Sequence, residues 1–162
     1  MDKKSIWLTR IKVALIREMF PDDYDELYDV LMAFKIHSEQ YFDLGLTFEM
    51  AKLQFIKGEW DLSKITFDEL RKQSRGFKYR LIPSSSDRWL EKGKPRKCQG
   101  IIVKPPTLEE WGFLRSHEPA ISYRIPVWHK AMSYERYSKG DRVTFEIVFN
   151  MVGPQASNVL QR

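Results

Sequence analysis

The side chains that most often perform catalysis or bind metals are sparse in this sequence. Its three histidines, His37, His117 and His129, are not spaced as metal ligands on a helix, and its one cysteine, Cys98, excludes a multi-cysteine zinc site and an internal disulfide. No H-E-x-x-H, C-x-x-C, G-x-S-x-G or phosphate-binding glycine loop occurs. We therefore expect a protein that is not an enzyme and that uses no cofactor and no metal.

Two features could be reactive groups, and each has a plainer interpretation. Lys97 beside Cys98 could lower the pKa of the thiol, although a lone thiol next to a strand is more often an ordinary core residue. Glu109 and Glu110 are adjacent carboxylates. Their place in the first turn of a helix beginning near Thr107 explains them without catalysis.

Positive charge is the strongest signal. Residues 71–104 carry eleven Lys and Arg against two acids, whereas residues 1–70 carry nine basic residues and fourteen acids. A basic segment of this kind attracts nucleic-acid phosphate, anionic lipid, or an acidic protein surface such as a second copy of the chain. The plain alternative is a solvated loop that only maintains solubility. The binding residues predicted from this segment are Arg71, Lys72, Arg75, Lys78, Arg80, Arg88, Lys92, Lys94, Arg96 and Lys97.

Two smaller patterns predict contacts with other surfaces. Trp89 and Leu90 lie in a basic, serine-flanked segment; they either pack back onto the domain or serve as an apolar anchor for a membrane or a neighbouring protomer. An acidic helix start complements the basic segment in charge, so copies of the chain could join head to tail into a lattice. Its acidic residues are Asp22, Asp23, Asp25, Glu26 and Asp29.

Apolar periodicity predicts the elements that would position these residues. Residues 5–16 alternate and predict a strand. Pro21 and the acids after it predict the first turn of an amphipathic helix that continues to about His37. Residues 45–57 fit both the alternation of a strand and one face of a helix, and of these we favour a second helix. The later expectations are a strand over 77–82, a long loop over 83–100, a strand from Cys98, a short helix from Thr107, a strand over 120–128 and a strand over 141–152.

These elements predict an α+β fold in which a mainly antiparallel sheet packs against two or three helices and carries a long basic loop. With 162 residues, of which 43% are hydrophobic, the chain is long enough for one domain with a real core. We expect a single globular domain over residues 6–152 with a mobile loop at about 83–100. Residues 1–5 and 153–162 would be short tails.

No apolar run approaches the roughly 20 residues that a membrane-spanning helix requires. The first residues also lack the apolar core and cleavage site of a signal peptide. The expectation is therefore a cytosolic protein whose membrane contact is peripheral.

In the order and spacing of its segments the chain resembles the globular domain of rhabdovirus matrix proteins. The resemblance depends on four segments, residues 6–16, 25–31, 77–83 and 137–149, with a long loop between the last two. It departs from the animal-virus members because a long lysine-rich N-terminal arm with a P-P-x-Y motif is missing; the sequence Pro105-Pro106-Thr107-Leu108 lacks the tyrosine. A shortened member, as in plant-infecting rhabdoviruses, fits better.

This resemblance implies a viral structural protein that self-associates, binds anionic membrane at its inner face and condenses the nucleocapsid for virion assembly and budding. Its partners would be itself, the nucleocapsid and anionic lipid. It would be found in the virion and the host cytoplasm. The basic cluster at Lys94 to Lys97 resembles a nuclear-import signal, so a nuclear location is an alternative. The alternative is a small basic nucleic-acid-binding module, such as an RNA-binding accessory protein or silencing suppressor, whose partner is RNA.

Overall fold

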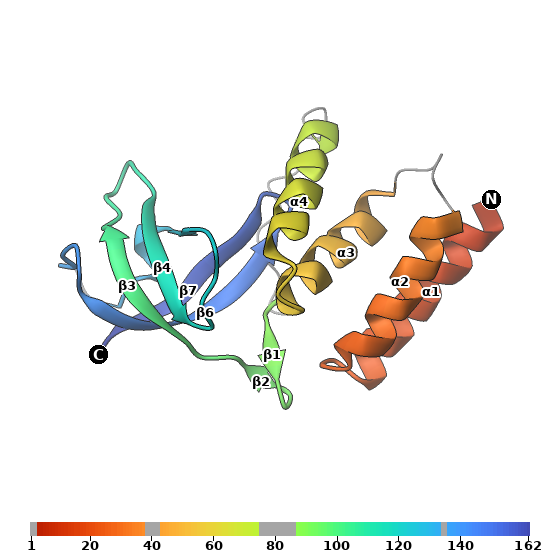
Figure 1. Ribbon diagram of the computed structural model, residues 1–162, viewed down its shortest axis with the longest axis horizontal. Helices are drawn as coiled ribbons and strands as arrows, with labels where there is room; N and C mark the ends of the chain where they lie inside the picture. Colours follow the sequence, from red (N-terminus) through yellow and green to blue (C-terminus); the bar gives the residue numbers. More distant parts are fainter. Residues whose placement is uncertain (1–2, 38–42, 75–86, 134–135) are drawn as a thin grey trace. The chain divides into compact units, whose positions relative to one another are not determined.

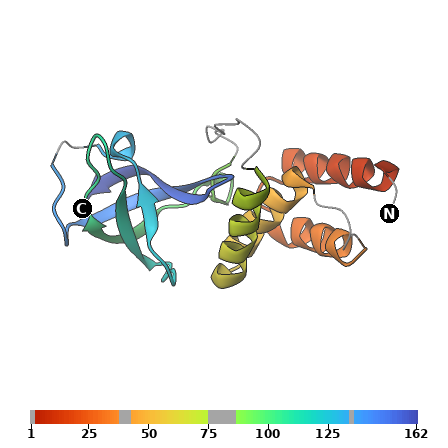
Figure 2. The same cartoon turned by 90° about the horizontal axis from the view of Figure 1, so that it is seen from above.

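The computed structural model describes residues 3–37, 43–74, 87–133 and 136–162. The chain forms two compact units, residues 1–78 and 79–162 (Figures 1 and 2). The α-helices described all belong to the first unit and the strands to the second, so the predicted α+β class is confirmed. The predicted globular region, residues 6–152, spans both units.

Helix α1 covers Lys3–Met19, where the sequence predicted a tail and then a strand. Val13 and Ile16 are buried on one side of the helix, while Trp7 and Leu15 are exposed. A helix with apolar residues on two sides imitates the alternation of a strand over a short window. The strand prediction for residues 5–16 is therefore wrong.

Helix α2 covers Tyr24–His37 and confirms the predicted amphipathic helix. It begins at Tyr24 rather than Pro21 because Asp23 caps it: the Asp23 carboxylate accepts a hydrogen bond from the Glu26 N–H at 3.3 Å. Asp25 and Glu26 occupy the first turn, where the helix dipole favours negative charge. Part of the acidic pattern thus has a local structural cause.

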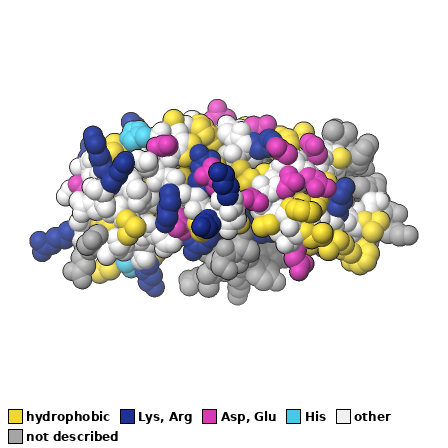
Figure 3. All heavy atoms as spheres, turned by 90° about the horizontal axis from the view of Figure 1, so that it is seen from below, with side chains coloured by type: hydrophobic (Ala, Val, Ile, Leu, Met, Phe, Trp, Pro, Cys, Tyr) yellow, Lys and Arg dark blue, Asp and Glu magenta, His cyan; other side chains and the backbone are white. Residues whose placement is uncertain are grey.

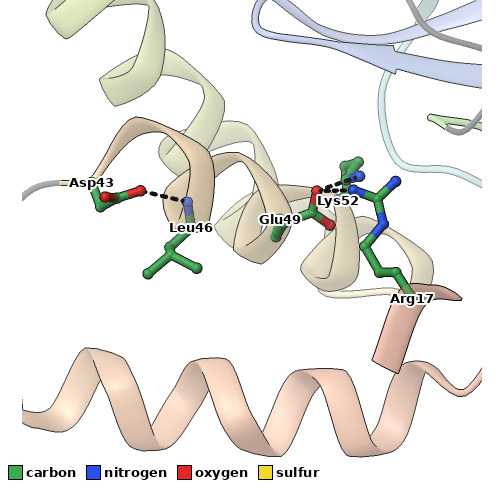
Figure 4. Close-up of polar contacts among 5 residues, drawn as sticks. All are labelled: Arg17, Asp43, Leu46, Glu49 and Lys52. Carbon is green, nitrogen blue, oxygen red and sulfur yellow. Dashed lines mark hydrogen bonds and ion pairs between the residues drawn. The ribbon is translucent and has the colours of Figure 1, made fainter. Parts of the chain in front are cut away.

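Helix α3, Leu44–Ile56, confirms the predicted second helix and is buried along most of its length. Asp43 caps it by accepting a hydrogen bond from the Leu46 N–H at 2.9 Å (Figure 4). The Glu49 carboxylate accepts hydrogen bonds from Arg17 at 2.6 Å and Lys52 at 2.9 Å. One core of this unit joins α1, α2 and α3 through Val13, Ile16, Leu27, Leu31, Leu46, Met50 and Leu53.

Helix α4, Trp60–Ser74, packs on α3. The rings of Phe48 and Phe67 meet edge to face at 6.3 Å. The Ser63 hydroxyl donates to the Ala51 carbonyl at 2.8 Å. The buried hydroxyl of Ser63 on α4 thus finds its hydrogen-bond partner on the backbone of α3.

The second unit is a closed barrel of five strands: β3 (Cys98–Lys104), β4 (Gly112–Glu118), β5 (Ile125–Val127), β6 (Arg142–Asn150) and β7 (Gly153–Gln161). Their order is β3-β4-β5-β7-β6, and β6 closes the barrel by pairing with β3. Strands β5 and β7 pair in parallel, while the other strand pairs described are antiparallel. This is the arrangement of the five-stranded Greek-key barrel called the OB-fold.

The barrel core confirms some predicted strands and corrects others. Strand β6 confirms the predicted strand and buries Phe145 and Ile147 completely, but both of its faces are buried from Phe145 to Asn150. The short helix predicted from Thr107 is wrong: the Thr107 hydroxyl accepts from the Glu110 N–H at 3.0 Å in a turn, and strand β4 follows. The predicted tail at 153–162 is wrong as well, because β7 pairs along β6.

Residues 87–100, within the predicted mobile loop, are also structured. Strands β1 (Leu90–Glu91) and β2 (Lys94–Pro95) form a hairpin, and Lys92 and Gly93 at its tip have the positive φ angles of a tight two-residue turn. The hairpin joins the barrel where the Trp89 N–H donates to the Ile147 carbonyl at 3.0 Å. The strand predicted over 77–82 lies outside the described residues.

Candidate functional site

Strand β4 and the residues that flank β4 and β5 carry aromatic and basic side chains that are at least partly exposed. Along β4, Leu114 is buried, whereas Phe113 is partly exposed and Arg115 is exposed. Phe113 pairs with Pro126 on β5, and Arg115 pairs with Ile101 on β3. Strand alternation thus places apolar surface and a cation side by side on one face.

Two tryptophans complete this surface at the start of β4 and the end of β5. Gly112 pairs with Val127, so the preceding Trp111 and the following Trp128 meet at the same edge. Their ring centroids are 5.1 Å apart, with 39° between the planes. The ring of His129 lies 4.5 Å from that of Trp128. We call Trp111, Phe113, Trp128 and His129 the aromatic face.

The segment between β3 and β4 approaches strand β4 closely at Gly112. A Cβ atom at Gly112 would collide with the backbone of Lys104 and Pro106, so this approach requires glycine. Lys104 pairs with Glu110 at 2.7 Å, and its hydrogen bond and charge lower the pKa of that carboxyl group. The turn is thereby held beside Trp111, which is 40% exposed.

The aromatic face was not predicted, because its residues come from two segments with different expectations. The segment from Thr107 onward was predicted to be a short helix, whereas Trp128 was the last residue of a predicted strand. The signal that identifies it is the alternation of Trp111, Phe113, Arg115 and His117, which places aromatic and basic side chains on the same side of a strand.

The predicted basic residues prove to have different surroundings. Arg88 and Lys97 each lie 2.5 Å from the buried carboxylate of Glu146, and Arg96 lies over the Trp89 ring at 4.3 Å. Arg88, Arg96 and Lys97 therefore have partners within the barrel unit and do not form a free cationic surface.

The remaining predicted cations stay exposed or undescribed. Lys92 and Lys94 are exposed on the hairpin. Arg71 pairs with Asp68 within α4, and Lys72 is exposed in the last turn of that helix. Arg75, Lys78 and Arg80 lie outside the described residues.

The predicted anchor residues differ from each other. Trp89 is only 4% exposed, so its ring packs back onto the domain, as one of the two alternatives had it, and is not available as a surface anchor. Leu90 is half-buried.

The acidic residues of the helical unit lie around the start of α2. Asp25 pairs with Lys57, while Asp23, Glu26 and Asp29 are exposed and Asp22 is half-buried. These placements leave acidic surface on the helical unit, as the head-to-tail hypothesis requires, but they do not test the contact between copies.

Two ionisable groups inside the barrel have shifted pKa values. Burial raises the pKa of the Cys98 thiol to about 11, so an activated thiolate at this position is not favoured. Burial alone would raise the pKa of Glu146. Hydrogen bonds from Lys97 and Asn158, and the charges of Lys97 and Arg88, instead hold it below its usual value. Glu146 is thus an internal counter-ion.

The described residues contain no cluster of three or more His, Cys, Asp or Glu side chains arranged to hold a metal ion. None of the described helices is long and apolar enough to span a lipid bilayer.

Among known proteins, no family model matches the chain, and no curated protein sequence matches it.

Proposed function

We propose that the barrel binds single-stranded nucleic acid through the aromatic face. The observation that carries this proposal is the pair of partly exposed tryptophans, 5.1 Å apart, at the edge of β4 and β5. In OB-type barrels the surface of the second and third strands is a frequent site for oligonucleotides. Here those strands are β4 and β5.

The chemistry of the face supports unpaired bases as its ligand. Indole and phenyl rings stack on any base, and each such contact contributes about 1–3 kcal/mol. In a duplex the base faces are already stacked, so exposed rings reach them only in single strands. Arg115 on the same face supplies a cation near the phosphates.

The charge of the barrel half of the chain is consistent with this ligand. Residues 79–162 carry fourteen Lys and Arg and eight Asp and Glu. Three of these cations have partners near the hairpin, but exposed Arg115, Arg124 and Lys130 lie along or close to β4 and β5. Positive charge of this kind concentrates nucleic acid and makes its binding depend on salt.

Fluorescence anisotropy with labelled single-stranded RNA and DNA, and with the matching duplexes, tests the proposal. Trp111→Ala should weaken single-strand binding about 5- to 150-fold, the equivalent of one lost stacking contact. The matched control is Trp7→Ala, because Trp7 is 60% exposed on α1 of the other unit. Equal affinity of Trp111→Ala and wild type, or preference for duplex, would overturn the proposal.

A membrane-facing matrix role, implied by the resemblance, stays a separate hypothesis. Two segments that carried it differ from expectation: residues 6–16 are helical, and residues 87–100 form a hairpin and the start of β3. Exposed Lys92 and Lys94 at the hairpin are the observation in its favour. Sedimentation with anionic liposomes tests it, and unchanged sedimentation of Lys92→Ala/Lys94→Ala would remove the hairpin from that role.

A further inference from the structure

A pocket borders the aromatic face. Its walls come from the segment between β3 and β4 and from the segment between β5 and β6, and its volume is about 790 Å³. This lies within the roughly 300–1,000 Å³ typical of small-ligand sites. Its lining includes Pro106, Leu108, His129, Met132, Ser133 and Arg136.

The pocket and the aromatic face are continuous. His129 lines the pocket, and its ring is also 4.5 Å from that of Trp128. On the other side, Thr107 lines the pocket, and its hydroxyl accepts a hydrogen bond at 3.0 Å from the N–H of Glu110, the residue before Trp111. A nucleic-acid strand whose bases stack on the two tryptophans therefore lies next to the pocket.

The lining mixes apolar and polar side chains, which suits a flat heteroaromatic ring attached to a phosphate. Pro106, Leu108 and Met132 offer apolar surface. The hydroxyl group of Ser133, an exposed residue of the lining, can donate and accept hydrogen bonds. Arg136 is exposed and also lines the pocket, so it can meet a phosphate.

We infer that the pocket receives one unstacked nucleotide of the bound strand, its base beside His129 and its phosphate near Arg136. The inference rests on the proposed function and adds to it that one position of the strand is bound differently from its stacked neighbours. A base edge in the pocket would hydrogen-bond to the hydroxyl group of Ser133, an exposed residue of the lining. The protein would then recognise the base at this position of the nucleic acid by hydrogen bonding as well as by stacking.

The test is an abasic scan combined with pocket variants. Fluorescence anisotropy measures the affinity of wild type for single-stranded octanucleotides that carry one abasic site at each position in turn. It is repeated with Leu108→Ala/Arg136→Ala, whose two side chains are exposed, so that folding is retained. The matched control is Leu62→Ala/Lys64→Ala, two exposed residues of α4. Thermal melting verifies that each variant is folded.

At one position of the octanucleotide, we expect the effects of the abasic site and of the pocket substitutions on binding affinity to be non-additive. There the abasic site weakens wild-type binding about 5-fold or more, as expected for one lost base contact, and weakens the pocket variant no further. At other positions the two changes combine independently. The control variant should reproduce the wild-type scan.

Other outcomes overturn the inference in distinguishable ways. If the pocket variant binds every probe like wild type while Trp111→Ala binds weakly, the pocket inference fails and the proposed function stands. If no single strand binds wild type, both fail. If adenosine or uridine monophosphate binds and only the pocket variant loses it, with octanucleotide affinity unchanged, the pocket serves free nucleotides and the inference is overturned.

Discussion

The helical unit and the barrel unit use similar residues to make different surfaces. Residues 1–78 carry thirteen Lys and Arg and fourteen Asp and Glu, whereas residues 79–162 carry fourteen and eight. On the face seen in Figure 3, acidic side chains lie mostly over the helices and basic ones mostly over the barrel. The net charge of the whole chain, +5, conceals this division.

The exposed apolar residues differ in the same way. The helical unit exposes mainly residues of two helices, including Leu8, Leu15 and Met19 on α1 and Ile65 on α4. The barrel instead brings two indole rings together and places Arg115 on the same pair of strands. Separate apolar side chains, among them Trp7 on α1, can join any apolar partner, whereas paired rings beside cations match the bases and phosphates of nucleic acid. The comparison teaches that arrangement, more than composition, separates a possible recognition surface from general apolar exposure.

The largest expected effect is a loss of stability of the barrel. Phe145→Ala removes a completely buried ring of β6, and we expect a loss of about 3–5 kcal/mol in the free energy of unfolding. Urea denaturation measures this, with Leu160→Ala on the exposed side of β7 as control. A loss as small as that of the control would show that the barrel does not depend on this core.

A smaller effect should follow from Glu146→Gln. This change leaves Arg88 and Lys97 without their buried carboxylate, and we expect it to destabilise the protein by about 1–3 kcal/mol. The folded-state pKa of Glu146 lies below its ordinary value of 4.5, so its stabilisation is complete above the unfolded-state pKa and is lost as pH falls through the folded-state pKa. Wild type should therefore lose more stability than Glu146→Gln in acid below about pH 4.5. Parallel pH profiles in urea denaturation would contradict this.

The next prediction sharpens the contrast between the two charged surfaces. Arg115→Gln should weaken single-strand binding at every sequence and reduce the slope of log affinity against log salt by about 1, as expected for one lost phosphate contact. Lys64→Gln on α4 should leave the slope unchanged, since its cation belongs to the helical unit. Equal slopes for all three proteins would remove Arg115 from the binding surface.

The smallest effect is expected at the surface of the helical unit. Asp25 pairs with Lys57 but its side chain is largely exposed, so Asp25→Asn should change the free energy of unfolding by less than about 1 kcal/mol. Light scattering on the double reversal Asp25→Lys/Glu26→Lys addresses the head-to-tail hypothesis separately. An unchanged oligomer size would eliminate that contact.

Sequence reasoning succeeded where apolar residues recur with a clear strand or helix period. The alternation around Phe145 and Ile147 predicted β6, and the spacing of Leu27 and Leu31 predicted α2. It failed at α1, whose second apolar side carries Trp7. It also failed at β7, where Gly153 and Pro154 looked like the end of the chain's structure but pair with β6. Barrel closure is a tertiary effect that local patterns do not contain.

The candidate site was predicted only in its charge. A basic run does not reveal which cations have partners far along the chain, and Glu146 is 49 residues from Lys97. The aromatic face depends on the register that places Gly112 opposite Val127. That register brings Trp111 and Trp128 together, and only the folded sheet specifies it.

The closeness of Trp111 and Trp128 also gives the protein a label-free optical signal. Indoles at 5.1 Å couple their electronic transitions, so the pair should produce a couplet in circular dichroism that either single substitution removes. A ligand that stacks on these rings would alter the couplet, while buried Trp89 would stay unaffected. Occupancy can therefore be followed at the rings themselves, without attaching a dye to the protein or its ligand.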